Sequence, residues 1–109
     1  MDRVGAEAFD GTRLLRPGVW GVGFLADWCP FCRSFAPKLE ALADHGAFQL
    51  LRADVSDEES PLWDRFGIEV VPTVIVFRDG VPVFRRDGRL GQGLREADLN
   101  AFEDALSRG

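Results

Sequence analysis

The chain has 109 residues, of which 46% are hydrophobic and 28% are charged, a composition typical of a globular domain. Its formal net charge is −5, from 13 basic and 18 acidic residues, so no basic surface is expected for a nucleic acid or an anionic membrane. The length predicts one domain over residues 1–109, large enough for a hydrophobic core without metal or disulfide support.

The N-terminus and the cysteine content predict a cellular compartment. Met1–Gly5 has no basic stretch followed by an apolar core, so we expect no secretory signal and a cytoplasmic protein. The longest apolar run, Val19–Ala26, is far too short to span a bilayer. Two cysteines occur in the chain, and such a pair in a cytosolic protein is more often redox-active than structural.

Hydrophobic periodicity predicts the elements of the first half of the chain. Ala6–Leu15 has a weak helical pattern, and Val19–Ala26 is apolar on both faces, as expected for a central parallel strand. Pro30–Asp44 is predicted as a helix because its apolar residues form one stripe and Gly46 follows as a stop signal. Phe48–Val55 is predicted as a second strand.

The second half of the chain predicts two further helices and a hairpin. Asp57–Phe66 is expected as a short helix, because acidic residues in its first turn suit the helix dipole. Thr73–Phe77 and Val81–Arg86 flank an Asp-Gly turn and predict an antiparallel hairpin. Glu96–Ser107 has an amphipathic helical pattern. Together the elements predict an α/β domain whose sheet is parallel in its middle and antiparallel at one edge.

The two cysteines stand three positions apart, directly after the predicted strand Val19–Ala26. Pro30 suits the first position of a helix, which makes Cys29 the predicted N-cap. The Cys29 sulfur would then face the free N–H groups of Phe31 and Cys32, which favour the thiolate over the thiol. We therefore predict Cys29 as the attacking thiolate and Cys32, one turn inside the helix, as the resolving thiol.

Two other interpretations of the cysteines are less favourable. Each cysteine can be a small buried hydrophobic side chain, although the three-residue spacing argues against this. A zinc site generally needs four ligands, and the chain offers one cysteine pair and a distant His45. We predict no metal, and we expect His45 at a helix C-terminus, where a partial positive charge is favourable.

Val71-Pro72-Thr73 begins a segment whose pattern is that of a buried strand. Proline is awkward there unless its missing N–H is not needed by the sheet. A cis bond before Pro72 would form a tight turn that meets this condition. An ordinary trans proline at the strand entrance is the alternative.

Four segments in this order resemble the thioredoxin family: Phe24–Cys32, Phe35–Pro37, Val71–Thr73 and Phe77–Gly80. The resemblance extends over nearly the whole chain, from about Val4 to Leu106. It implies the α/β thioredoxin fold, a central five-stranded mixed sheet flanked by helices on both faces. It also implies a cis proline beside the cysteines and a proline that kinks the helix after them, at positions 72 and 37.

The resemblance also implies roles for individual residues. Cys29 is similar to the family's nucleophile, Cys32 to its resolving cysteine, and Arg52 to a basic residue near the active site. The backbone of the residue before Pro72 is expected to pair with an extended protein client by strand addition. The positions expected to bind substrate are Trp28, Pro30, Phe31, Val71 and Pro72. The family resemblance implies a monomer without a bound cofactor, supplied with electrons by a thioredoxin reductase or a low-molecular-weight thiol.

The chain departs from the family pattern near the site. Gly23 stands where the family has a buried acid, Leu25 where it has a tryptophan, and Pro30-Phe31 where Gly-Pro is usual. Asp27 is the nearest carboxylate in the sequence, but we expect it to point outward and assign it no proton-transfer role.

These departures predict a more oxidising couple and slower resolution of mixed disulfides. An added N–H at position 31 and a missing carboxylate at position 23 both stabilise the reduced, thiolate form. We expect a reduction potential above the roughly −270 mV of thioredoxin, and a shift of about 30 mV is enough to be detected by equilibration with a glutathione buffer. A potential at or below that of thioredoxin would contradict this expectation.

The sequence thus predicts a thiol-disulfide oxidoreductase of the thioredoxin type that reduces or exchanges protein disulfides. One alternative is glutathione-linked exchange of the glutaredoxin kind, which the Cys-Pro-Phe-Cys sequence supports. A helix before the first central strand and the lack of a Gly-Gly-x-Asp-like segment after Pro72 count against it. A second alternative is a non-catalytic module that presents the Pro72 edge to a partner.

Overall fold

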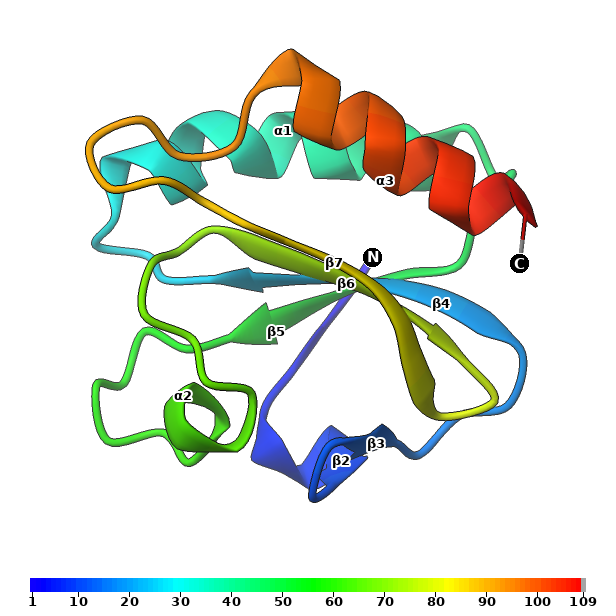
Figure 1. The fold of residues 1–109 in the computed structure, drawn as a ribbon, viewed down its shortest axis with the longest axis horizontal. Coiled ribbons are helices and arrows are strands. Elements are labelled where there is room, and N and C mark those ends of the chain that lie inside the picture. Colours follow the sequence, from blue (N-terminus) through cyan, green and yellow to red (C-terminus); the bar gives the residue numbers. More distant parts are fainter. Residues whose placement is uncertain (109) are drawn as a thin grey trace.

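The computed structural model describes residues 1–108 and contains a five-stranded sheet in the order β1-β5-β4-β6-β7 (Figure 1). The strands are β1 (Asp2–Val4), β4 (Val19–Leu25), β5 (Leu50–Asp54), β6 (Thr73–Arg78) and β7 (Val81–Asp87). β5 runs parallel to both β1 and β4, whereas β6 is antiparallel to β4 and β7. The predicted mixed sheet, antiparallel at one edge, is therefore confirmed.

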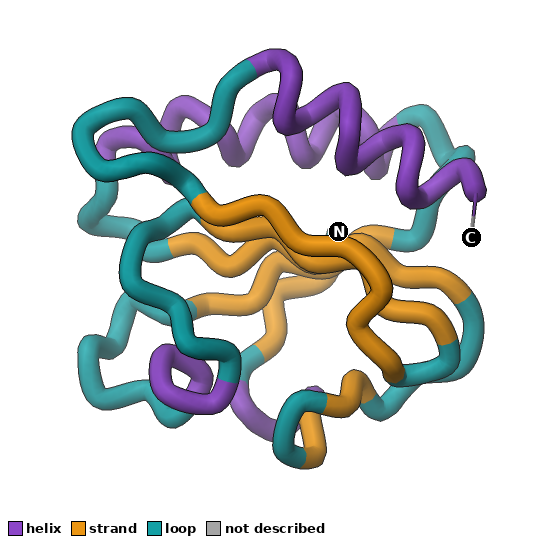
Figure 2. The backbone as a smooth tube through the Cα atoms, in the orientation of Figure 1, coloured by secondary structure: helices purple, strands orange, loops and turns teal. Residues whose placement is uncertain are grey.

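Helices cover both faces of the sheet. The long helices α1 (Pro30–Asp44) and α3 (Glu96–Arg108) lie side by side over one face. The short helix α2 (Leu62–Arg65) and the small hairpin of β2 (Phe9–Asp10) and β3 (Arg13–Leu14) lie on the opposite side (Figures 1 and 2). Within residues 1–108, no helix is both long enough and apolar enough to cross a bilayer.

The predicted helix over Ala6–Leu15 is wrong. The segment forms a single 3-10 turn, η1 (Ala6–Ala8), followed by the β2–β3 hairpin. Phe9 and Leu14 are cross-strand partners, and both side chains are buried. Burial of these two side chains outweighs a weak helical propensity, because tertiary packing contributes more than propensity does. Gly11, with a φ of +60°, closes the turn between the two short strands.

Two further elements differ from the sequence prediction. Strand β1 was not predicted, because three residues are too few for a periodic pattern. The helix predicted over Asp57–Phe66 contains only Leu62–Arg65. Its first part is a turn in which the Asp57 carbonyl accepts a hydrogen bond from Ser60 N–H at 3.0 Å. Pro61 disfavours the helical conformation of the residue before it, so the helix begins only after the proline.

The central strand β4 carries two glycines on the face that α1 and α3 cover. A Cβ atom on Gly21 would lie 2.6 Å from both Leu50 Cδ2 and Phe102 Cζ. A Cβ atom on Gly23 would lie 2.6 Å from Leu39 Cδ2. The glycines therefore let both helices pack closely on the sheet. Leu39 occupies the space in which a side chain of residue 23 would begin.

Candidate active site

Helix α1 begins directly at the cysteine pair, which follows the end of β4. Cys29 is the N-cap, in an extended conformation with φ −90° and ψ 120°, and Pro30 is the first helical residue. The Cys29 carbonyl accepts the first helical hydrogen bond, from Arg33 N–H at 3.1 Å. The predicted helix start is confirmed. Cys29 is 6% exposed and Cys32 is fully buried, so the two thiols differ in their access to a partner.

The predicted contact between the Cys29 sulfur and the helix N–H groups is wrong for this state of the site. The Cys29 side chain makes no capping hydrogen bond. Its thiol instead donates to the carbonyl oxygen of Val71, with Sγ 3.6 Å from the oxygen. Both cysteines are free thiols, and an S–H group is a donor that turns toward an acceptor. The contact nevertheless places the Cys29 sulfur against the backbone of the residue before Pro72.

The Cys32 thiol lies in an environment that opposes its ionisation. Burial raises the pKa of Cys32 to about 12, while the Ala26 N–H group lowers it. The neighbouring Cys29 thiol also raises this pKa, and the charge of Arg52 lowers it. The Ala26 nitrogen lies 3.4 Å from Cys32 Sγ, so this N–H group can stabilise a thiolate when one forms.

The complete burial and raised pKa of Cys32 predict the alkylation pattern of the reduced, native protein. Near neutral pH, iodoacetamide is expected to label the chain once, at Cys29. Cys32 is fully buried, and its pKa is raised to about 12, so its thiol stays protonated. Mass spectrometry of the digested protein locates the label. Protein unfolded in guanidinium is the control and should carry two labels. Equal labelling of both cysteines in the native protein would contradict the prediction.

The raised pKa of Cys32 also sets the direction of a pH effect on stability. The pKa of the Cys32 thiol is about 8.5 in the unfolded chain and about 12 in the folded protein. The stability associated with the neutral buried thiol is therefore fully present below the first value. It is lost as the pH rises through the second.

A shallow apolar groove borders the Cys29 sulfur. It has a volume of about 180 Å³, and its lining includes Trp28, Cys29, Phe31, Trp63, Val71 and Leu90. Trp28 is half exposed, stacks on Trp63 with ring centroids 6.4 Å apart, and donates from its indole N–H to the Ser56 carbonyl at 2.9 Å. The aromatic rim is thus held in place by packing and by a hydrogen bond.

The Val71–Pro72 peptide bond is cis, as the family resemblance implies. Pairing of β4 with β6 begins at Thr73, so Val71 lies before the ladder and beside Cys29. The Pro72 carbonyl accepts a hydrogen bond from Gly88 N–H at 2.8 Å, which ties the loop after β7 to this turn. The loop carries Leu90, which is 87% exposed and lines the groove.

Sequence reasoning did not identify Leu90 as a site residue. Its one signal is a large aliphatic side chain in a glycine-rich segment with neither helical nor strand periodicity. That signal does not show which part of the surface the loop reaches. The hydrogen bond from Gly88 N–H to the Pro72 carbonyl supplies that information, because it places the loop that carries Leu90.

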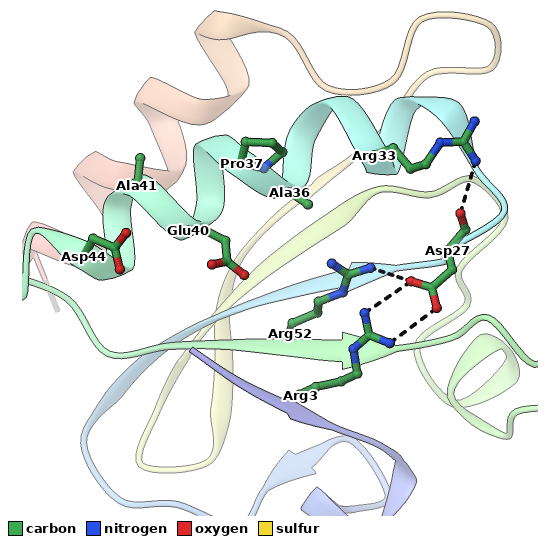
Figure 3. Close-up of a pocket in the computed structure, with 9 residues that line it drawn as sticks. All are labelled: Arg3, Asp27, Arg33, Ala36, Pro37, Glu40, Ala41, Asp44 and Arg52. Carbon is green, nitrogen blue, oxygen red and sulfur yellow. Dashed lines mark hydrogen bonds and ion pairs between the residues drawn. The ribbon is translucent and has the colours of Figure 1, made fainter.

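Asp27, in the turn between β4 and α1, is the centre of a charged cluster. The Asp27 carboxylate accepts hydrogen bonds from Arg52 at 2.8 Å and from Arg3 at 3.2 Å (Figure 3). Asp27 points outward as expected, with its side chain 56% exposed. Arg33 donates to the Asp27 backbone carbonyl at 3.2 Å. These residues line a depression of about 720 Å³, larger than the groove at Cys29, and neither cysteine is part of its lining.

His45 and Pro37 are the remaining positions that the sequence singled out. His45 caps the C-terminal end of α1, as predicted, and is exposed. Pro37 lies inside α1, as the family resemblance implies. Among residues 1–108, no three His, Cys, Asp or Glu side chains cluster in a way that could hold a metal ion.

A dithiol at the start of a helix, beside backbone that the sheet leaves unpaired, defines the class of thiol-disulfide oxidoreductases. Comparison with known proteins narrows the class. The sequence model of the Thioredoxin family matches residues 6–101. The chain is 32% identical to a thioredoxin of Rhodospirillum rubrum over 91 residues, which covers 83% of this chain and 88% of that protein.

Two further comparisons agree with this match. A thioredoxin of Mycolicibacterium smegmatis is 40% identical over 88 residues, covering 78% of this chain and 76% of the relative. The crystal structure of Fasciola hepatica thioredoxin superposes with a TM-score of 0.65 and 29% identity, covering 85% of this chain and 82% of that one. The chain belongs to the thioredoxin family, whose general activity is that of a thiol-disulfide oxidoreductase.

Proposed function

We propose that this protein reduces or exchanges disulfides of protein clients through a Cys29–Cys32 dithiol/disulfide couple. The observation that carries the proposal is the unequal placement of the two sulfurs. Cys29 borders an open groove, and Cys32 is fully buried one turn further along α1. Such a pair has one sulfur for the client and one that a client cannot reach.

In the proposed reaction, the Cys29 thiolate attacks a client disulfide. One client sulfur leaves as a thiolate, and a mixed disulfide joins Cys29 to the other client sulfur. Cys32 then attacks Cys29, the Cys29–Cys32 bond forms, and the second client sulfur is released. The client disulfide gains two electrons, and the dithiol of the protein loses two.

The groove supports the binding of an extended client segment. The proposed contact residues, predicted from the sequence, are Trp28, Pro30, Phe31, Val71 and Pro72. Trp28 and Phe31 supply exposed apolar surface on one side of the Cys29 sulfur. Val71 lines the same groove, with its carbonyl oxygen 3.6 Å from Cys29 Sγ, and lies before the β4–β6 ladder begins. A client strand placed there can pair with main-chain groups at Val71 and fill the groove with its side chains.

The wider assignments extend this proposal. We infer one thioredoxin-like domain over residues 1–109, acting as a cytoplasmic monomer that requires no bound cofactor. Electrons would come from a thioredoxin reductase or a low-molecular-weight thiol. Glutathione-linked exchange was disfavoured partly by a helix expected before the first central strand. That helix is absent among the described residues, so the case against glutathione rests on the lack of a Gly-Gly-x-Asp-like segment after Pro72 and on the family match.

The proposed function is tested by trapping clients with the Cys32→Ser variant. Removal of the resolving sulfur should leave clients attached to Cys29 as mixed disulfides, which non-reducing electrophoresis separates and dithiothreitol releases. The matched control is the Cys29→Ser variant, which should retain no client. If the two variants capture the same proteins, or if the wild type turns over glutathione disulfides but no protein disulfide, the proposal is wrong.

A further inference from the structure

We propose that Leu90 and Glu69 are specificity-determining residues of the groove at Cys29. Together they select client segments that carry a large apolar side chain beside the attacked cysteine and a basic residue close by. The inference rests on the proposed function and goes further, because it names the class of client. The contact positions predicted from the sequence include neither residue.

Leu90 stands at the tip of a small hairpin in the loop between β7 and α3. Arg89 N–H donates to the Gly93 carbonyl at 3.1 Å, and Gly93 N–H donates to the Arg89 carbonyl at 2.8 Å. Gln92 N–H also donates to the Arg89 carbonyl, at 2.9 Å. Gly91 and Gly93 have φ values of +75° and +69°, in the region that favours glycine. The loop is therefore a hydrogen-bonded turn with a defined backbone.

Two glycines anchor this hairpin on the dithiol site. Gly88 N–H donates to the Pro72 carbonyl at 2.8 Å, and a Cβ atom on Gly88 would lie 2.7 Å from the same oxygen. A Cβ atom on Gly93 would lie 2.8 Å from the Cβ atom of Phe31, which lies between the two cysteines. Figure 1 shows the loop beside the start of α1. Leu90 is thus held at the groove before a client arrives, which lowers the cost of ordering on binding.

The exposure of Leu90 points to an apolar partner. Among residues 1–108, no other large hydrophobic residue is as exposed as Leu90, at 87%. A single exposed leucine is ordinary, but Leu90 lines the groove together with the rings of Trp28, Phe31 and Trp63. A water molecule takes about 30 Å³ in the liquid, so a groove of about 180 Å³ has room for a large client side chain. Burial of that side chain against Leu90 stabilises the complex through the hydrophobic effect.

Glu69 adds a charge to this apolar groove. Besides the Cys29 thiol, it is the only acidic or basic side chain in the lining, and Arg89 is not part of that lining. Glu69 is exposed, and none of the ion pairs among residues 1–108 involves it. Its carboxylate is therefore available to a basic residue of a client. The formal net charge of −5 acts in the same direction, because it attracts basic segments.

The two residues act on client binding and leave the transfer of electrons as described for the proposed function. When Cys29 attacks a client cysteine, the residues beside that cysteine enter the groove. A large apolar neighbour then contacts Leu90, whereas a polar one leaves Leu90 in water. A lysine or arginine comes within reach of Glu69, whereas an acidic residue is repelled. Selection is therefore expected in the rate of attack on different clients, not in resolution by Cys32.

Four symmetric peptide disulfides test the proposal. They differ only in one neighbour of the cysteine, leucine or serine, and in one further position, lysine or glutamate. Reduced wild-type protein is mixed with each, and chromatography after an acid quench gives the rate of attack. Dividing by the rate of the same peptide with dithiothreitol removes the effect of the side chains on the disulfide itself. We expect leucine to exceed serine about tenfold, and lysine to exceed glutamate about threefold at low salt.

Variants separate the two preferences. Leu90→Ser should reduce the leucine preference to about twofold or less and keep the lysine preference. Leu90→Ala, a second truncation at this position, should also weaken the leucine preference. Glu69→Gln should abolish the lysine preference and Glu69→Lys should reverse it, while both keep the leucine preference. Added salt should weaken only the lysine preference, because it screens charge.

Two substitutions outside the groove lining are matched controls. Leu15→Ser removes another exposed leucine, and Glu40→Gln removes another exposed glutamate, which lines the depression around Asp27. Both variants should keep both preferences at the wild-type level. All the replaced residues are exposed, so the variants are expected to fold, and their unfolding transitions check this.

The proposal is overturned if the wild type lacks either preference, or if a preference persists in the variant that has lost its residue. It is also overturned if the matched controls lose a preference, because selection would then not come from the groove. Failure of the wild type to reduce any of the four peptides would contradict the proposed function itself. Reduction of all four at equal normalised rates would contradict only the selection by Leu90 and Glu69.

Discussion

Replacing Cys29 with serine is expected to lower the turnover of a protein-disulfide substrate by at least about a thousandfold. A serine hydroxyl does not ionise near neutral pH, and its oxygen does not exchange with disulfide sulfurs. Cys32 cannot take over the attack on the substrate, because it is fully buried and its pKa is raised to about 12. Reduction of insulin disulfides, followed by turbidity with dithiothreitol as electron donor, measures the loss.

Cys32→Ser is the matched control for this experiment. It should also stop turnover but keep the first attack, so that one client per protein stays attached to Cys29 as a mixed disulfide. Folding of both variants is checked by their unfolding transitions. Turnover of Cys29→Ser within about tenfold of the wild type would mean that Cys32 is the attacking sulfur, in conflict with its burial.

Replacing Gly21 with alanine is expected to lower the free energy of unfolding by about 2 kcal/mol. The new methyl group would meet the side chains of Leu50, Phe102 and Leu106 at 2.6, 2.6 and 3.0 Å. All three residues are buried, so they cannot move aside without disturbing α3 or β5. Urea unfolding curves, compared at equal slope, measure the change.

Gly23→Ala is the matched control, because it adds the same methyl group two residues along the same strand. It has one contact below 3.0 Å, with Leu39 Cδ2 at 2.6 Å, whereas Gly21→Ala has two, and Leu25 Cδ1 is farther away at 3.4 Å. Alanine also reduces the entropy of the unfolded chain, which offsets part of the strain. We expect a clearly smaller loss than for Gly21→Ala. Equal stability of Gly21→Ala and the wild type would show that the sheet and α3 are less closely packed than the structure indicates.

The sequence was sufficient for the elements that bear on the dithiol. The strand Val19–Ala26 and the helix Pro30–Asp44 were predicted to within one residue of β4 and α1, and the Cys29 cap to the residue. Both predictions rest on local chemistry: a long apolar run, and a proline that suits the first position of a helix. Local chemistry left the bond before Pro72 open between a cis turn and an ordinary trans proline, and the cis bond observed was implied by the family resemblance.

Prediction failed where a segment is held by distant partners. The helix predicted over Ala6–Leu15 does not form, because Phe9 packs against Phe24, Phe66 and Phe77, with ring centroids 5.2 to 5.9 Å apart. Phe24 lies near the C-terminal end of β4, and Phe66 and Phe77 follow Phe9 by more than 50 positions in the sequence. No pattern within a ten-residue window records such contacts.

By itself, the sequence determined that the thiol pair lies at the junction of a strand and a helix. It also determined that a second strand begins directly after Pro72. Both follow from spacing and backbone preference, which are properties of neighbouring residues. The tertiary structure alone decided that Cys29 faces the Val71 carbonyl, that Leu90 lines the same groove, and that Arg52 lies opposite an empty position 23. These contacts depend on sheet register and on the path of loops. Both are set by the burial of the whole core, so they cannot be obtained from any one segment.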